Sequence, residues 1–198
     1  MPSVLVTAFE PYDRWPTNAS WQCLLELTRE MPAQPAIATR RYPVDFTKAR
    51  ARLAADLAAN YDYALHLGQA PGSSQIRLEA FALNVGGAPG DPPDKLRPLE
   101  EDGPAAYRSA LPLADWAIRL RAAGLPAAVS HHAGTYLCNA TLYWSHYLAE
   151  RMGLKTQAAF VHLPLETAQA ACEPRETPSL PAPLTAAALR LILEQLVG

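Results

Sequence analysis

The sequence has few cysteines, little excess charge and no long apolar run, and each of these absences excludes a class of protein. Its three cysteines, Cys23, Cys138 and Cys172, are irregularly spaced in 198 residues, which suits neither a disulfide framework nor a zinc site. The formal charge of -2 gives no reason to expect nucleic acid or anionic lipid as a partner. We find neither a secretory signal nor an apolar run of about 18 residues. We therefore expect a cytoplasmic protein that binds neither nucleic acid nor a membrane.

Apolar segments typical of strands alternate along the chain with segments typical of helices. Strands are predicted at 3–9, 37–44, 61–68, 75–84, 126–132 and 158–164, and helices at 18–30, 46–60, 113–124, 138–153 and 184–198. Asn18 is expected to cap the first helix and Gly124 to end the third. This alternation predicts an α/β fold, a three-layer αβα sandwich with a largely parallel central sheet, similar to phosphorylases and hydrolases. We expect one domain over residues 1–198, because no repeat or second domain is visible.

Two segments rich in proline and glycine are predicted to be loops. Residues 86–104 form a long stretch with little regular pattern, and we expect it to act either as a lid or as an assembly arm. Residues 171–184 read as a proline-rich connector to the last helix.

Cys138 lies where a predicted strand and a turn at Gly134 lead into a helix. A thiol at the start of a helix has its thiolate stabilised by the helix dipole and by free backbone N–H groups. The same N–H groups can bind an oxyanion after attack on an acyl carbon. Cys138 is therefore a candidate nucleophile, with a small buried apolar residue as the alternative.

Two further residues fit a catalytic arrangement with Cys138. His162 ends an apolar strand, one helix and one strand after Cys138; since such a unit brings consecutive strand ends to one edge of a parallel sheet, we expect a thiol–imidazole pair. The alternative is a histidine bonded to a backbone carbonyl. Glu79 lies on an otherwise apolar strand, where a buried carboxylate needs a partner. That partner is either an arginine such as Arg77 or the second nitrogen of His162.

Five blocks of the sequence carry a resemblance to a known family. They are TAFEPYD followed by TNASW, then HLGQAPGSSQIRLEAFALN, DGPAAYRSALP, SHHAGTYLCN and AFVHLP. In these blocks, and over nearly its whole length, the chain resembles the pyroglutamyl peptidase I family, also called pyrrolidone-carboxylate peptidases. The family patterns S-x-x-A-G-T-Y-x-C-N and G-F-I-H-x-P are the most specific of the matches.

The resemblance implies an activity and a set of site residues. Glu79, Cys138 and His162 would form the catalytic triad of a cysteine peptidase that removes an N-terminal pyroglutamyl residue through an acyl-enzyme. Phe9 and Tyr12 would flank the lactam ring, and Gln69, Tyr136 and Leu137 would complete the pocket. The partners would be N-terminal pyroglutamyl peptides or free pyroglutamate. The family requires neither metal nor cofactor, and its members often form homodimers or homotetramers.

The chain departs from the family pattern near the pocket. Ala8 replaces a glycine, Asp13 and Arg14 replace the glycines after Tyr12, and Ser73 and Ala80 replace arginines. Ala8 is expected to disfavour a positive φ, and a buried Tyr12 hydroxyl needs a hydrogen-bond partner.

These departures keep other functions open. One is a non-catalytic or slow homologue that binds pyroglutamate or peptide on the same scaffold. Another is an enzyme for a different small N-terminal acyl group. A nucleoside phosphorylase-type enzyme is disfavoured because no phosphate-binding glycine loop is evident.

Overall fold

A six-stranded sheet forms the centre of the computed structural model, which describes residues 1–197. Its strands lie in the order β2-β1-β3-β8-β4-β7. They are β1 (Ser3–Phe9), β2 (Ala36–Tyr42), β3 (Tyr63–Gln69), β4 (Ile76–Glu79), β7 (Ala127–Ser130) and β8 (Gln157–Leu163). β1, β2, β3 and β8 are parallel, whereas β4 pairs antiparallel with β8 and parallel with β7. The predicted largely parallel sheet is confirmed, with two reversed strands at one edge.

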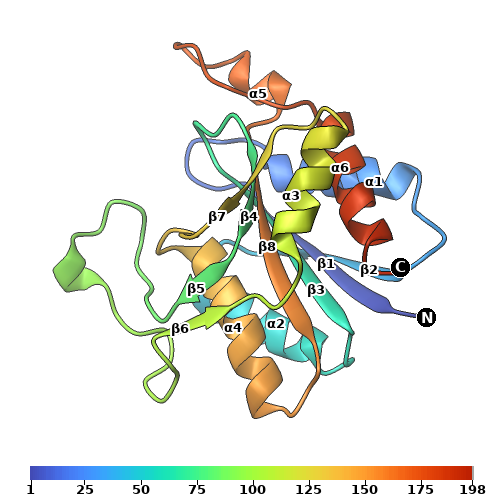
Figure 1. The fold of residues 1–198 in the computed structure, drawn as a ribbon. Helices are drawn as coiled ribbons and strands as arrows, with labels where there is room; N and C mark the ends of the chain where they lie inside the picture. Colours follow the sequence, from blue (N-terminus) through green and yellow to red (C-terminus); the bar gives the residue numbers. More distant parts are fainter. Residues whose placement is uncertain (198) are drawn as a thin grey trace.

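Helices cover both faces of this sheet (Figure 1). On one face lie α1 (Ala19–Arg29), α3 (Leu113–Ala122) and α6 (Ala182–Glu194), and on the other lie α2 (Phe46–Leu57) and α4 (Leu137–Arg151). Alternate residues of β1 serve the two layers, because Val4 and Val6 pack under α1 and α6 while Leu5 packs under α2 and α4. The three-layer αβα sandwich is thus confirmed, and burial on both faces explains why the strands read as continuous apolar runs.

Two predicted helix ends, at Asn18 and at Gly124, agree with the structure, whereas α2 and α6 end at Leu57 and Glu194, before the predicted residues 60 and 198. Asn18 caps α1, with its side-chain oxygen accepting a hydrogen bond from the Ser20 N–H. Gly124 follows α3 with φ +78°, the left-handed conformation that glycine adopts readily after a helix. The last residue of the predicted C-terminal helix, residue 198, lies outside the described part of the chain.

The prediction of one half-exposed strand over residues 75–84 is wrong. The chain turns at Ala80: its N–H donates to the Ser130 carbonyl of β7, and its own carbonyl accepts from the Ser109 N–H. β4 therefore ends in the main sheet, and β5 (Phe81–Leu83) pairs antiparallel with β6 (Ala106–Arg108), which was not predicted. Most of β4, including Glu79, is buried because the strand has a neighbour on each side.

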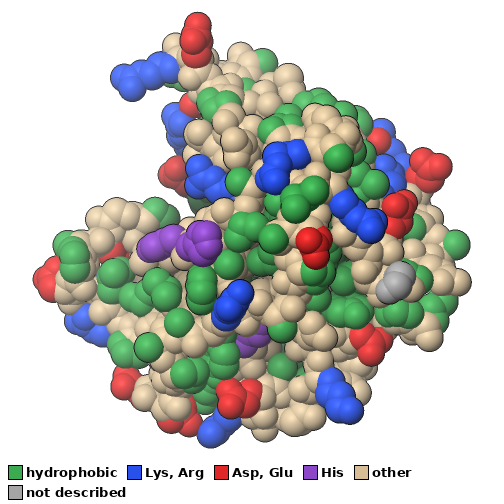
Figure 2. All heavy atoms as spheres, in the orientation of Figure 1, with side chains coloured by type: hydrophobic (Ala, Val, Ile, Leu, Met, Phe, Trp, Pro, Cys, Tyr) green, Lys and Arg blue, Asp and Glu red, His purple; other side chains and the backbone are tan. Residues whose placement is uncertain are grey.

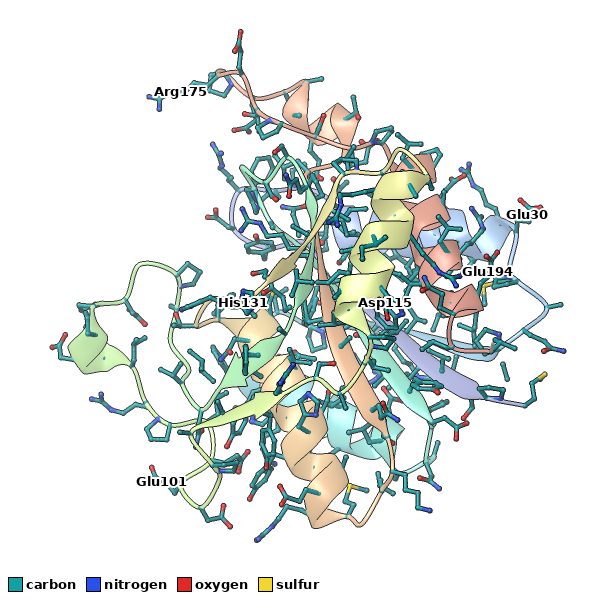
Figure 3. The ribbon with its side chains drawn as sticks, in the orientation of Figure 1. Glu30, Glu101, Asp115, His131, Arg175 and Glu194 are labelled. Carbon is teal, nitrogen blue, oxygen red and sulfur yellow. The ribbon has the colours of Figure 1, made fainter. Side chains whose placement is uncertain are left out.

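Residues 86–104 form an arm that projects from one side of the body and contains the 3-10 helix η1 (Pro93–Lys95). The arm is fastened at its base. The Asn84 side-chain oxygen accepts hydrogen bonds from the N–H groups of Leu99 and Glu100, and Arg50 forms an ion pair with Glu100 at 2.6 Å. The neighbouring Glu101 lies on the loop that leads from the arm back to β6 (Figure 3).

A second projecting segment follows β8. It contains the short helix α5 (Thr167–Ala170), which was not predicted, and the proline-rich connector to α6, with Arg175 at its tip (Figure 3). Of the helices described between residues 1 and 197, none has the length and apolar character needed to cross a membrane.

Candidate active site

α4 begins at Leu137, one residue earlier than predicted, so Cys138 is the second residue of the helix and not the first. Gly134 makes the turn before the helix with φ +82°. Tyr136 is the N-cap and supplies no side-chain hydrogen bond to the helix. The first N–H groups of α4 are therefore left uncapped beside the sulfur.

The geometric premise that linked Cys138 to His162 is wrong, although the two residues do meet. β7 does not lie beside β8; β4 separates them, and β7 runs antiparallel to β8. Consecutive strand ends therefore do not share an edge. Instead, residues 131–136 carry the chain to α4, which packs along β8 and β3. This loop brings the Cys138 sulfur to the end of β3, beside Gly68, whose register partner on β8 is His162.

His162 and Glu79 form a buried pair across the antiparallel strands β8 and β4. The distance from His162 Nδ1 to Glu79 Oε1 is 2.8 Å. This bond leaves the other ring nitrogen for the sulfur. Within residues 1–197 no ion pair joins Glu79 to Arg77, so the alternative partner considered for Glu79 is not the one observed.

Electrostatics favour a charged imidazole in this pair. Burial opposes the charged form of His162, but the Cys138 sulfur and the Glu79 carboxylate outweigh burial and raise the pKa of His162 to about 9. Burial also raises the pKa of Glu79, yet the hydrogen bond and charge of His162 lower it below its ordinary value. A protonated imidazole beside a cysteine is the environment that stabilises a thiolate.

A small pocket of about 320 Å³ opens beside Cys138. All five residues predicted to bind substrate line it together with the nucleophile, and none of the lining side chains is an acid, a lysine or an arginine. The lining residues are Phe9, Tyr12, Asn18, Val44, Gly68, Gln69, Tyr136, Leu137 and Cys138. Such a site suits a small uncharged group with hydrogen-bonding capacity.

Gln69 has one polar atom available for a ligand. Its Oε1 accepts hydrogen bonds from the Ala19 N–H at 2.8 Å and from Gln169 Nε2 at 2.9 Å. These donors fix the orientation of the amide group. Its Nε2 is buried and has no hydrogen-bond partner of ordinary geometry among the described residues, which is costly unless a ligand acceptor satisfies it.

The departures in the opening loop are accommodated. Ala8 lies in the regular strand β1 and does not need a positive φ. The positive φ of this loop occurs at Asp13, where it is +52°. Aspartate tolerates the left-handed region better than most side chains. The Tyr12 hydroxyl faces Gln69, and burial together with the charge of Cys138 raises the pKa of Tyr12 to about 12. Tyr12 therefore stays protonated near neutral pH.

Two residues that support the site were missed in the sequence. A side chain at Gly68 would meet the Phe160 ring at 2.6 Å and the Cys138 sulfur at 3.0 Å, so only glycine fits there. Asn139 is buried and bonds three backbone groups: it accepts from the Leu83 N–H and donates to the carbonyls of Leu83 and Val85. Both lie inside the family blocks HLGQA and CN, which was the available signal.

Within the described residues 1–197, no group of three or more His, Cys, Asp or Glu side chains is arranged to hold a metal ion.

The fold and the site together have the layout of a cysteine hydrolase: an α/β sandwich with a cysteine at a helix start, facing a histidine that a buried carboxylate orients.

Comparison with known proteins identifies the family. The model of the pyroglutamyl peptidase family matches residues 2–197. The chain is 35% identical to pyrrolidone-carboxylate peptidase 1 of Ralstonia nicotianae, covering 98% of this chain and 92% of that protein. The crystal structure of pyrrolidone carboxyl peptidase from Fervidobacterium islandicum superposes with a TM-score of 0.93 at 34% identity, covering 100% of this chain and 99% of that one. The enzyme from Thermococcus litoralis gives a TM-score of 0.90 at 29% identity, covering 98% and 92%. The chain therefore belongs to the pyroglutamyl peptidase family, whose activity is the hydrolysis of N-terminal pyroglutamyl residues.

Proposed function

We propose that Cys138, His162 and Glu79 carry out this hydrolysis as a catalytic triad. The observation that carries the proposal is the 2.8 Å bond between Glu79 and His162 beside the Cys138 sulfur. The sulfur attacks the carbonyl carbon that joins pyroglutamate to the next residue. His162 then gives its proton to the leaving amine, and the peptide departs. Water, deprotonated by His162, attacks the thioester, releasing pyroglutamate and restoring the thiol.

We propose that the start of α4 stabilises the oxyanion of the tetrahedral intermediate. The N-cap Tyr136 provides no side-chain acceptor, so the N–H groups of the first turn remain free near the sulfur. Such preorganised donors act where negative charge develops in the transition state. Asn139 supports this function by holding the first turn of α4 against Leu83 and Val85.

We propose that the pocket selects pyroglutamate because the lactam has no charged amine. A free N-terminal glutamate would bring an ammonium and a carboxylate into a pocket without a charged partner, and burying such groups unpaired costs several kcal/mol. The Gln69 Nε2 group is suited to donate to the lactam carbonyl, since its oxygen is already occupied. Phe9, Tyr12, Tyr136 and Leu137 supply the apolar surface around the ring.

Turnover of a pyroglutamyl-coumarin amide tests the triad. Cys138→Ser and His162→Ala should each lower kcat by at least about 1000-fold, because the nucleophile and base act as one unit. Glu79→Gln should lower it less, by about 10- to 100-fold. Wild-type rates in either of the first two variants would contradict the assignment. If the wild-type protein releases no fluorophore but free pyroglutamate raises its melting temperature, the protein is a binding homologue.

We further propose a cytoplasmic location and self-association into a homodimer or homotetramer. The location is supported by the cysteines Cys23, Cys138 and Cys172, all of which are free thiols. Self-association is supported by Leu25 on α1 and Leu184 on α6, two large apolar side chains that are 41% and 43% exposed on neighbouring helices. A single monomer mass in analytical ultracentrifugation would contradict the second proposal.

A further inference from the structure

A wide cleft opens directly outside the lactam pocket. Counted with the open space at the mouth, its volume is about 1230 Å³, compared with about 320 Å³ for the pocket. The two spaces share Tyr12, Val44 and Tyr136, so the cleft begins where the pocket ends. Figure 2 shows the molecule hollowed on the side between the arm of residues 86–104 and the body.

The remaining walls of the cleft come from three separate parts of the chain. They are residues 11–15 of the opening loop, Pro71 after β3, and Pro89 at the base of the arm. The arm is held in place here, because the Gly87 N–H donates to the Thr135 carbonyl at 2.9 Å. This bond ties the arm to the loop before α4, two residues before Pro89.

Most of the side chains that line the cleft are apolar or aromatic, although polar atoms make up nearly half of its exposed surface. Three prolines, two tyrosines, Trp15 and Val44 face it, and only Asp13 and Arg14 are charged. Arg14 is already engaged: it pairs with Glu173 at 2.7 Å and lies 4.6 Å from the centre of the Trp15 ring. Among the described residues, the walls thus offer apolar contact area, the carboxylate of Asp13, which forms no ion pair, and one cation, Arg14, which is paired with Glu173.

A second cleft lies on the other side of the same wall and provides a comparison. It also contacts Arg14, Trp15 and Pro71, but its other walls come from Gly72, Leu165 and the connector at residues 173–178. It shares no residue with the lactam pocket. The lactam pocket therefore adjoins the first cleft, with which it shares Tyr12, Val44 and Tyr136, and not the second.

We propose that the first cleft is the subsite for the residue that follows pyroglutamate, and that it selects an apolar or aromatic side chain there. The inference rests on the proposed function, because the bond that Cys138 attacks joins the ring in the pocket to this next residue. An acidic side chain is disfavoured because Asp13 lies in the cleft and Arg14 is paired with Glu173.

Competition between two dipeptide amides in one reaction tests the preference. Pyroglutamyl-phenylalanine amide should be cleaved about tenfold faster than pyroglutamyl-aspartate amide, since burying one aromatic side chain is worth at least this factor. The ratio of products is independent of enzyme concentration and of the lactam pocket, which is the same for both substrates. Equal rates, or faster cleavage of the aspartate amide, would overturn the proposal.

Exposed prolines on opposite walls allow the cleft to be changed without disturbing the core. Pro71→Asp and Pro89→Asp should each lower the phenylalanine-to-aspartate ratio at least threefold, by placing a carboxylate among apolar contacts. Pro178→Asp, at an exposed proline of the second cleft, is the matched control and should keep the wild-type ratio. A ratio that falls in Pro178→Asp, or stays unchanged in both other variants, contradicts the assignment.

Pyroglutamyl-alanine amide separates this proposal from the function on which it rests. If this substrate is cleaved while the phenylalanine-to-aspartate ratio is near one, the subsite assignment alone is wrong. If neither this amide nor any other pyroglutamyl substrate is cleaved, the proposed function is wrong and the subsite falls with it.

Discussion

At the scale of single residues, the environment of His162 decides how the site works. Its ring is buried between a carboxylate and a sulfur, and both raise its pKa against the effect of burial. Sequence reasoning found the three catalytic candidates because each was anomalous in its place: a carboxylate and an imidazole on apolar strands, and a thiol at a helix start. It missed Gly68, because the need for a residue without a side chain arises from Phe160 and Cys138, which are distant in sequence.

The raised pKa of His162 predicts the alkaline limit of activity. The protonated imidazole donates to the leaving amine, so kcat/KM should fall as pH rises through about 9, the pKa of His162. In Glu79→Gln this limb should move to lower pH, because the carboxylate that favours the charged imidazole has been removed. The measurement is a kcat/KM profile from pH 6 to 10.5.

A matched control for this profile is Glu26→Gln, which removes a carboxylate on α1 that pairs with Arg29. Its limb should coincide with that of the wild-type enzyme. An alkaline limb that stays in place in Glu79→Gln would show that Glu79 does not set the protonation of His162.

At the scale of elements, sequence patterns predicted most of the strands and helices, but they missed β6, α5 and the break between β4 and β5, and they did not predict how the strands are directed. Alternation with a period of two reports burial on each face and says nothing of strand order. The break at Ala80 depends on hydrogen bonds to Ser130 and Ser109, which lie far along the chain, and the reversal of β4 is seen only in its antiparallel pairing with β8. The start of α4 is likewise positioned by hydrogen bonds to residues distant in sequence, those of Asn139 to Leu83 and Val85, and not by the preceding strand.

Asn139 is predicted to hold that start of α4 in its working position. Asn139→Ala removes three hydrogen bonds to Leu83 and Val85 and should cost about 1–3 kcal/mol of unfolding free energy in urea, because buried backbone groups lose their partners. It should also lower kcat for pyroglutamyl-alanine amide in the fraction that remains folded.

Asn84→Ala is the comparison for that variant. Asn84 makes a similar set of bonds, but to Leu99, Glu100 and Gly103 in the arm. It should cost comparable stability with a smaller loss of kcat. If the two variants lose kcat equally, Asn139 acts only through general stability.

At the scale of the whole molecule, a buried histidine joins the central strands to α4. His66 Nδ1 lies 2.7 Å from the Thr7 hydroxyl of β1, and Nε2 lies 2.7 Å from the Ser145 hydroxyl of α4. The Ser145 hydroxyl donates to the Thr141 carbonyl, so Nε2 must donate to Ser145. Burial lowers the pKa of His66 to about 3, so the ring is neutral near pH 7 and Nδ1 accepts from the Thr7 hydroxyl.

This neutral ring predicts acid sensitivity of the fold. The pKa of His66 is about 6.5 in the unfolded chain and about 3 in the folded protein. Between these pH values the unfolded chain binds a proton that the folded protein does not bind. Stability from this group is thus complete above pH 6.5 and falls by about 1.4 kcal/mol per pH unit below about pH 6. The free energy of unfolding, measured in urea between pH 6.5 and 5, should fall less steeply with decreasing pH in His66→Gln, by about 1.4 kcal/mol per pH unit.

His131→Gln is the control for the acid series, since it removes a histidine that is exposed (Figure 3). It should retain the wild-type slope. A slope that is the same in wild type and His66→Gln would mean that His66 does not stay neutral in the folded protein.

The most direct test of the account is the site of covalent labelling by pyroglutamyl chloromethyl ketone. The chain has three free thiols of different exposure: Cys23 is buried, Cys138 is partly buried and Cys172 is exposed. If Cys138 is the nucleophile of the lactam pocket, peptide mass spectrometry should find the label on Cys138, and free pyroglutamate should protect it. Label on the exposed Cys172 instead, or inactivation that leaves Cys138 unmodified, would contradict the assignment of Cys138 as the nucleophile.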